Sequence, residues 1–198
     1  MQRPTPSHNP LREGVVSRPA PQPCSLVIFG ATGDLTHRKL VPALYNLAAD
    51  GDLPPGITVF GFARRPKNDE DFRAELRAAV KKFSRQGLNP DLWEQFASSI
   101  HYHQSEFGEA SGYHSLRERL DALDAARGVP SNRLFYLAAA PEQFGPILEF
   151  LRQSGLNTPP PGVWARIVVE KPFGKDLPSA RALNDVVESA FAEKDTYR

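Results

Sequence analysis

The stretch Leu26-Val-Ile-Phe-Gly30-Ala-Thr-Gly33-Asp-Leu-Thr36 decides the fold of this chain. Bulky apolar residues stop at Gly30, a second glycine follows at Gly33, and a helical pattern runs from about residue 37 to 50. The pattern predicts a strand, a tight glycine turn and a helix, a geometry that presents free backbone N–H groups to a phosphate. Gly30 can take backbone angles closed to other residues, and Gly33 has no side chain that would hold a pyrophosphate away. A dinucleotide is therefore the first ligand to consider.

The spacing of the two glycines leaves an alternative open. It reads Gly-x-x-Gly-x-x-Thr and departs from the Gly-x-Gly-x-x-Gly fingerprint of many dinucleotide sites. A two-glycine turn between a strand and a helix also serves plain chain reversal. The turn alone favours phosphate binding only moderately over that alternative.

The segment Ile57–Gly61 is predicted to form the next strand and to close a strand–helix–strand unit. In NAD-binding folds an acidic residue near the end of this strand binds the ribose hydroxyls. Here Arg64 and Arg65 follow, and the first carboxylate comes at Asp69. A guanidinium binds a 2′-phosphate through paired, charge-assisted hydrogen bonds, whereas a carboxylate would repel it. Arg64, with Arg65 as second choice, therefore favours NADP over NAD; the alternative is two solvated arginines in a surface loop.

Strands and helices are expected to alternate along the rest of the chain. Apolar runs predict the strands, and apolar residues at helical spacing predict the helices. The expected strands are 26–29, 57–61, 100–104, 133–138 and 166–169, and the expected helices are 37–50, 69–84, 90–96, 113–126, 141–154 and 179–192. This order predicts an α/β fold of the Rossmann-like, doubly wound class, with a mainly parallel sheet and helices on both faces. Ligands of such sheets gather at the carboxyl ends of the strands.

Composition and charge argue against several classes of protein. The 198 residues carry a net charge of +1 with both signs interspersed, so no broad field for nucleic acid or a membrane surface is expected. No apolar run approaches the roughly 20 residues of a membrane span. The single cysteine, Cys24, allows no internal disulfide and is compatible with the cytoplasm. His101 and His103 share a strand face but lack further ligands at zinc spacing, so no metal site is predicted.

The N-terminal residues 1–23 differ in composition from the rest of the chain. They are rich in proline, with Ser, Asn and Gln, and they have too little apolar surface to fold. They are predicted to form a disordered tail, and residues 24–198 to form one NADP-binding domain.

Longer stretches resemble a known family. The run from Phe29 to Leu47, Phe-Gly-Ala-Thr-Gly-Asp-Leu-Thr-His-Arg-Lys-Leu-Val-Pro-Ala-Leu-Tyr-Asn-Leu, is similar to the opening of glucose-6-phosphate dehydrogenase. The likeness continues through Gly-Phe-Ala-Arg64, Asn132-Arg-Leu-Phe-Tyr-Leu-Ala138, Val169-Glu-Lys-Pro-Phe-Gly174 and Asp195-Thr-Tyr-Arg198. Five motifs in the same order make this resemblance far more specific than any glycine turn.

The resemblance implies an NADP-dependent oxidoreductase of glucose metabolism and the pentose phosphate pathway. In that family hydride moves from C1 of glucose 6-phosphate to the nicotinamide, and 6-phosphogluconolactone forms. The family's catalytic histidine lies beyond the position of Arg198, in a substrate domain that this chain lacks. No catalytic residue is therefore expected in the chain, which alone is expected to be inactive. Glucose 6-phosphate is the implied partner once the missing domain is present, and the full-length enzyme is implied to be a homo-oligomer.

The resemblance also implies a set of site residues. The lysine that matches Lys171 contacts both substrate and cofactor in the family, and Glu106 and Phe107 match a segment near the adenine. Ala138 is small enough for a nicotinamide to approach the backbone, although close helix–strand packing explains it equally well. The expected cofactor-binding residues are Gly30, Ala31, Thr32, Gly33, Asp34, Leu35, Arg64, Glu106, Phe107, Ala138, Phe144 and Lys171, and Lys171 is also the expected substrate-binding residue.

Two other interpretations stay open at this point. One is a non-catalytic NADP-binding module, such as a truncated product that needs a C-terminal half in trans. The other is a different two-domain sugar oxidoreductase with the same fold. The Gly-Asp-Leu-Thr and Phe-Ala-Arg segments argue against this last alternative.

Overall fold

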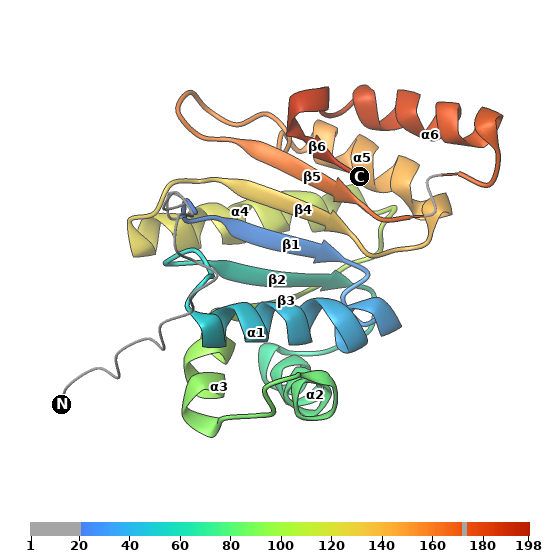
Figure 1. Ribbon diagram of the computed structural model, residues 1–198. Coiled ribbons are helices and arrows are strands. Elements are labelled where there is room, and N and C mark those ends of the chain that lie inside the picture. The colour runs from blue at the N-terminus through green and yellow to red at the C-terminus, as the bar shows by residue number, and fades with distance from the viewer. Residues whose placement is uncertain (1–20, 172–173) are drawn as a thin grey trace, which may run out of the picture.

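A six-stranded parallel sheet forms the centre of the molecule (Figure 1). The computed structural model describes residues 21–171 and 174–198. Its strands run in the order β3-β2-β1-β4-β5-β6, and every neighbouring pair is parallel. The strands are β1 Ser25–Phe29, β2 Thr58–Ala63, β3 Ile100–Gln104, β4 Arg133–Leu137, β5 Ala165–Val169 and β6 Thr196–Tyr197. The predicted α/β, Rossmann-like class is confirmed.

Helices follow the strands and cover both faces of the sheet (Figure 1). They are α1 Val41–Asp50, α2 Asp69–Phe83, α3 Pro90–Ala97, α4 Ala110–Arg127, α5 Phe144–Gln153 and α6 Leu177–Glu188. Side-chain caps fix where several of them begin. Asn68 and Asn89 accept hydrogen bonds from the first turns of α2 and α3, and Asp176 and Ser179 form a capping box at α6.

Alternation along each strand divides the apolar side chains between two cores. In β1, Val27 and Phe29 face one core, and Leu26 and Ile28 face the other. Apolar side chains of α4, α5 and α6 complete the first core, and those of α1, α2 and α3 complete the second. Because both faces of β1 are covered, its sequence is a nearly continuous apolar run, as is typical of buried parallel strands.

The structure differs from the sequence-based prediction near the C-terminus and after β1. The last helix ends at Glu188, not at residue 192, and the short strand β6 follows at Thr196–Tyr197. The predicted helix 37–50 begins with a π-helical turn at Thr36–Leu40. The predicted tail falls largely on residues 1–20, which lie outside the described residues.

Side chains form hydrogen bonds with the outward-facing backbone N–H and C=O groups of the edge strand β3. The Arg73 guanidinium donates to the Ile100 carbonyl at 2.6 and 2.8 Å. The Tyr102 N–H donates to Asp69 Oδ1 at 2.6 Å, and Arg119 donates to the Tyr102 carbonyl at 2.7 Å. These bonds give buried polar groups of an edge strand the partners that a further strand would otherwise supply.

A buried ion pair ties the start of β4 to α4. The side chains of Arg133 and Asp124 are each 5% exposed and are in ionic contact through Nη1 and Oδ2. Arg133 also donates to Asp121 Oδ1 at 3.0 Å, and the Ser25 hydroxyl donates to Asp124 Oδ1 at 3.4 Å. The pair therefore joins β1, β4 and α4.

His103 links the end of β3 to the beginning of α4. Its Nε2–H donates to the Gly112 carbonyl at 2.8 Å, and Arg119 Nη1 lies 3.5 Å from Nδ1. Burial lowers the pKa of His103, the hydrogen bond to Gly112 partly opposes this shift, and the charge of Arg119 adds to it. Burial also lowers the pKa of His101, against the opposing effect of Asp69. Folding therefore favours the neutral form of both imidazoles.

Folding stability is expected to fall as the pH drops from 7.5 to 5.5. The unfolded chain binds protons at its histidines below about pH 6.5, whereas folded His103 resists protonation, so acid favours the unfolded state. One group contributes at most about 1.4 kcal/mol per pH unit. Urea unfolding at both pH values checks this. His103→Gln keeps a donor for Gly112 but does not titrate, so its stability should change less; an equal loss in both proteins would contradict the assignment.

Candidate functional site

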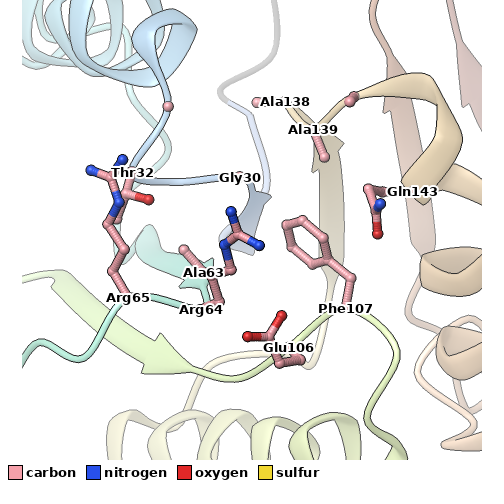
Figure 2. Close-up of a pocket in the computed structure, with 12 residues that line it drawn as sticks. Gly30, Thr32, Ala63, Arg64, Arg65, Glu106, Phe107, Ala138, Ala139 and Gln143 are labelled. Carbon is pink, nitrogen blue, oxygen red and sulfur yellow. The ribbon is translucent and has the colours of Figure 1, made fainter.

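A cavity of about 360 Å³ opens at the carboxyl ends of the strands (Figure 2). The strand order reverses at β1, which lies between β2 and β4, and ligands of doubly wound sheets bind where such neighbouring loops diverge. The loops after β1, β2, β3 and β4 all contribute to the cavity. Its lining consists of Gly30, Thr32, Gly33, Ala63, Arg64, Arg65, Glu106, Phe107, Ala138, Ala139, Ala140 and Gln143.

Gly30 makes the tight turn that ends β1. Its φ is +86°, and the N–H groups of Gly30 and Ala31 donate to the Phe62 carbonyl at 3.0 and 3.3 Å. A Cβ at this position would lie 2.4 Å from the Ala138 carbonyl oxygen, since β4 passes directly beside the turn. Both the backbone angle and the space therefore require glycine.

Gly30→Ala is expected to destabilise the chain and to distort the cavity. An alanine at positive φ costs about 1–2 kcal/mol, and the overlap with Ala138 adds about 1–3 kcal/mol. Gly51→Ala is the matched control, because Gly51 has φ +74° but nothing within 4 Å of its would-be Cβ. Urea unfolding gives the loss in free energy of unfolding for each variant, and the difference between the two losses is the cost of the overlap with Ala138. Equal destabilisation would show that β4 moves away without cost.

The loop after β1 turns its carbonyl groups inward. The Gly33 N–H donates to the Gly30 carbonyl at 2.9 Å, and the Thr36 hydroxyl donates to the same oxygen at 3.4 Å. The His37 Nδ1–H donates to the Gly33 carbonyl at 2.8 Å. The backbone N–H groups of this loop therefore face outward. The Thr32 N–H makes no hydrogen bond within the described part of the chain. The helical turn that begins at Asp34 leaves its first N–H groups without helical partners. Amides in this arrangement are suited to bind an anion.

Two guanidinium groups follow β2 and face the same loop. Figure 2 shows the Arg64 side chain extending into the cavity opposite Phe107, while the Arg65 side chain runs toward Thr32. The Tyr102 hydroxyl donates to the carbonyls of Ala63 and Arg65, at 3.2 and 2.6 Å, and so fixes the backbone between them. Burial, with a smaller effect of Glu75, raises the pKa of Tyr102, which keeps this donor protonated. The structure thus holds positive charge at this end of β2.

Glu106 and Phe107 stand at the end of the next strand, β3. The Glu106 carbonyl accepts hydrogen bonds from Ser105 Oγ at 3.1 Å and from the Glu109 N–H at 3.4 Å. The Phe107 carbonyl accepts a bond from the Tyr113 hydroxyl at 2.8 Å, and its ring stacks on Phe62 with centroids 6.0 Å apart. The loop is therefore well anchored, and the Glu106 carboxylate points into the cavity on the side of Arg64 (Figure 2).

Small residues after β4 form the opposite wall. Ala138, Ala139 and Ala140 line the cavity with Gln143. The small residues after this strand were noted in the sequence as room for a nicotinamide, but only Ala138 was predicted as a contact. Their small size leaves the backbone open to a flat ring, and they also lie next to Gly30 in the turn after β1.

Phe144 and Ala31, two of the predicted contact residues, do not lie at the cavity surface. Phe144 is 1% exposed and packs in the first core, where the helix α5 directs it because α5 buries its apolar face against the sheet. The prediction that its side chain contacts a cofactor is corrected accordingly, and its neighbour Gln143 lines the cavity instead. Ala31 is fully buried, and its N–H is already bonded to Phe62.

Three further predicted residues do not line the cavity. Asp34 is exposed and pairs with Arg38 at 3.4 Å, and Leu35 is half-buried. Lys171 is exposed and follows β5. Its neighbour Glu170 accepts a hydrogen bond from the Tyr136 hydroxyl, and burial together with Glu170 raises the pKa of that tyrosine well above its usual range. Pro172 and Phe173, the next residues of the motif, lie outside the described residues.

Other kinds of site are not found in the described parts of the chain. Within residues 21–171 and 174–198, His, Cys, Asp and Glu side chains form no group of three that could hold a metal ion. None of the helices described is long and apolar enough to cross a bilayer. The cavity at the carboxyl ends of the strands is thus the site to interpret.

The fold and the site define a domain of the doubly wound class that binds dinucleotides. Residues 27–198 match the family model described as glucose-6-phosphate dehydrogenase, NAD binding domain. The chain belongs to this family, as its motifs had indicated.

Relatives and solved structures agree with that assignment. The chain is 45% identical to glucose-6-phosphate 1-dehydrogenase of Chlamydia muridarum over 196 residues, which cover 95% of this chain and 38% of that protein. It is 41% identical to glucose-6-phosphate 1-dehydrogenase 2 of Mycobacterium bovis, covering 96% and 37%. A glucose-6-phosphate dehydrogenase solved in complex with its substrate glucose-6-phosphate superposes with a TM-score of 0.80 at 32% identity, covering 89% and 36%. The chain therefore spans little more than a third of the length of these relatives.

Proposed function

We propose that residues 24–198 bind NADP in the cavity at the carboxyl ends of the strands, as the coenzyme domain of a glucose-6-phosphate dehydrogenase. The observation that carries this proposal is the Arg64 guanidinium, which extends into the cavity from the end of β2 (Figure 2). NAD-binding domains place a carboxylate there for the ribose hydroxyls, and a guanidinium is suited to a 2′-phosphate instead.

The remaining residues fit the other parts of the same ligand. The unpaired amides of Thr32, Asp34 and Leu35 suit the pyrophosphate, which favours the positive end of a helix. Gly33 allows the phosphates to approach the backbone closely. The wall at Ala138 leaves room for the nicotinamide, and the cavity volume lies within the range typical of small-molecule sites.

The activity of the whole protein is proposed from its relatives. They are glucose-6-phosphate dehydrogenases, so glucose 6-phosphate is the proposed substrate, and the nicotinamide of bound NADP accepts the hydride. Lys171, a mobile point charge beyond the end of β5, is proposed to contact both substrate and cofactor. This chain's part in the reaction is to hold the cofactor in place, which supplies the proximity component of catalysis.

Titration of the chain with NADP and with NAD tests this function. NADP is expected to bind about 10–100-fold more tightly, because each charge-assisted hydrogen bond to the 2′-phosphate contributes about 1.5–3 kcal/mol. Calorimetry gives both dissociation constants, and the preference should shrink as salt is added. Equal affinities for the two dinucleotides would contradict the argument from Arg64.

A further inference from the structure

The carboxylate of Glu75, on α2, contacts two loops that lead into the proposed NADP site. They are the phosphate loop, residues 30–37, which follows β1, and the arginine loop, residues 64–68, which follows β2. Oε2 of Glu75 lies 3.6 Å from Nε2 of His37, in the first loop, and Oε1 is in ionic contact with Nζ of Lys67, in the second. One carboxylate thus bridges the two loops, although it does not line the cavity.

His37 connects Glu75 to the backbone of the phosphate loop. Its Nδ1–H donates to the Gly33 carbonyl at 2.8 Å, and its backbone N–H donates to the same oxygen at 3.3 Å. The imidazole therefore lies between Gly33 and Glu75, with one ring nitrogen toward each. Because a carbonyl oxygen turned toward a phosphate would repel it, the bond from His37 favours the backbone arrangement that an anion needs.

Lys67 connects Glu75 to the arginine loop. The Lys67 side chain is only 16% exposed, so its ammonium group is held against Glu75 and does not move freely in solvent. In the same loop, the Arg65 carbonyl accepts a hydrogen bond from the Tyr102 hydroxyl at 2.6 Å. After burial, Glu75 is the largest cause of the raised pKa of Tyr102, so the carboxylate also lies close to this hydroxyl. The backbone that carries Arg64 is therefore anchored at Arg65 and at Lys67.

From these contacts we propose that Glu75 is a positioning residue, which fixes the spacing between the phosphate loop and the arginine loop and thereby strengthens the preference for NADP over NAD. The inference rests on the proposed NADP site. NADP would engage both loops at once, through its pyrophosphate and its 2′-phosphate, whereas NAD lacks the second anion. Loops that are held at the right spacing before the ligand arrives lower the ordering cost of binding, and this benefit is greatest for the ligand that needs both.

The proposal predicts a change opposite in sign to the one that charge alone would cause. A carboxylate near a ligand with several phosphates repels it, so the loss of that charge by itself would tighten the binding of NADP. Glu75→Ala is expected instead to weaken NADP about fivefold and NAD by less than about twofold, because the loops lose the contacts that hold their spacing. Calorimetric titration of the 198-residue chain with both dinucleotides gives the two dissociation constants and their ratio.

Three further variants make the test specific. Glu75→Gln keeps an acceptor oxygen for Lys67, so it is expected to restore the NADP-to-NAD preference to within about twofold of wild type. Glu70→Ala is the matched control, because it removes an exposed carboxylate from the same helix that does not line the cavity, and it should keep the wild-type preference. Lys67→Met breaks the same link from the arginine loop and should repeat the loss seen in Glu75→Ala. It decides the test if Glu75→Ala does not fold, which urea unfolding shows.

The outcomes separate the inference from the function on which it rests. If Glu75→Ala and Lys67→Met keep the wild-type preference, if Glu75→Ala tightens NADP, or if it weakens both dinucleotides equally, the inference is overturned while NADP binding stands. If the wild-type chain binds neither dinucleotide, the proposed function fails and the inference fails with it. A preference that falls in Glu75→Ala and in Lys67→Met and returns in Glu75→Gln supports the inference.

Discussion

Arg64→Ala is expected to lower the affinity for NADP about 10–100-fold and to leave the affinity for NAD within about twofold. In the proposed site the guanidinium would form paired, charge-assisted hydrogen bonds to the 2′-phosphate, each contributing about 1.5–3 kcal/mol, and NAD has no such group. The side chain extends into the cavity and is exposed, so its removal should leave the fold intact. Titration of the variant with both dinucleotides checks the result.

Two further variants make this prediction specific. Arg65→Ala removes the second guanidinium, which runs toward Thr32, and is expected to have a smaller effect than Arg64→Ala. Arg85→Ala removes a guanidinium that pairs with Asp50 at 2.7 Å and does not line the cavity, and it should leave both affinities unchanged. If Arg64→Ala weakened NADP and NAD equally, the arginine would act on a part common to both ligands and the 2′-phosphate assignment would be wrong.

Asp124→Ala is expected to lower the free energy of unfolding by about 3–5 kcal/mol. The Arg133 guanidinium, 5% exposed, would lose the buried carboxylate with which it is in ionic contact, and an incompletely compensated charge would remain inside the protein. The Ser25 hydroxyl would lose its acceptor as well. Urea unfolding at neutral pH measures the change.

Asp121→Ala is the control for the buried pair. Asp121 also pairs with Arg133, at 3.0 Å, but its side chain is 56% exposed, so its removal should cost less than about 1 kcal/mol. Equal losses in the two variants would show that solvent reaches the pair and that its burial has no energetic importance. A negligible loss of unfolding free energy in Asp124→Ala would likewise show that the burial of the pair has no energetic importance.

Local patterns predicted most of the fold because most elements carry their own signal. The strand β1 is an apolar run that stops at a glycine, and the helix α2 shows apolar residues on one face and an asparagine cap. The strand β6 has only two residues, Thr196 and Tyr197, and it exists because β5 pairs with it. Such pairing between distant segments leaves no trace in a short window of sequence.

The same distinction applies to the candidate site. Glycines and arginines after strands could be found because their chemistry is unusual at those positions, and Gly30, Gly33 and Arg64 do line the cavity. Gln143 was missed, since only the path of the chain brings it to the cavity. Phe144 was misplaced although its spacing with Ile147 and Leu148 is that of a buried helix face. The ion pair of Arg133 with Asp124 was also missed, since it forms between β4 and α4.

The bonds on the outer side of β3 also bear on how this molecule meets others. A strand from another molecule would have to displace Asp69, Arg73 and Arg119 from the backbone of Ile100 and Tyr102 before it could pair. Unprotected sheet edges are templates for edge-to-edge aggregation and amyloid-like stacking, and charged side chains are a common protection against both. These three side chains therefore protect this edge of the sheet against pairing with a strand of another molecule.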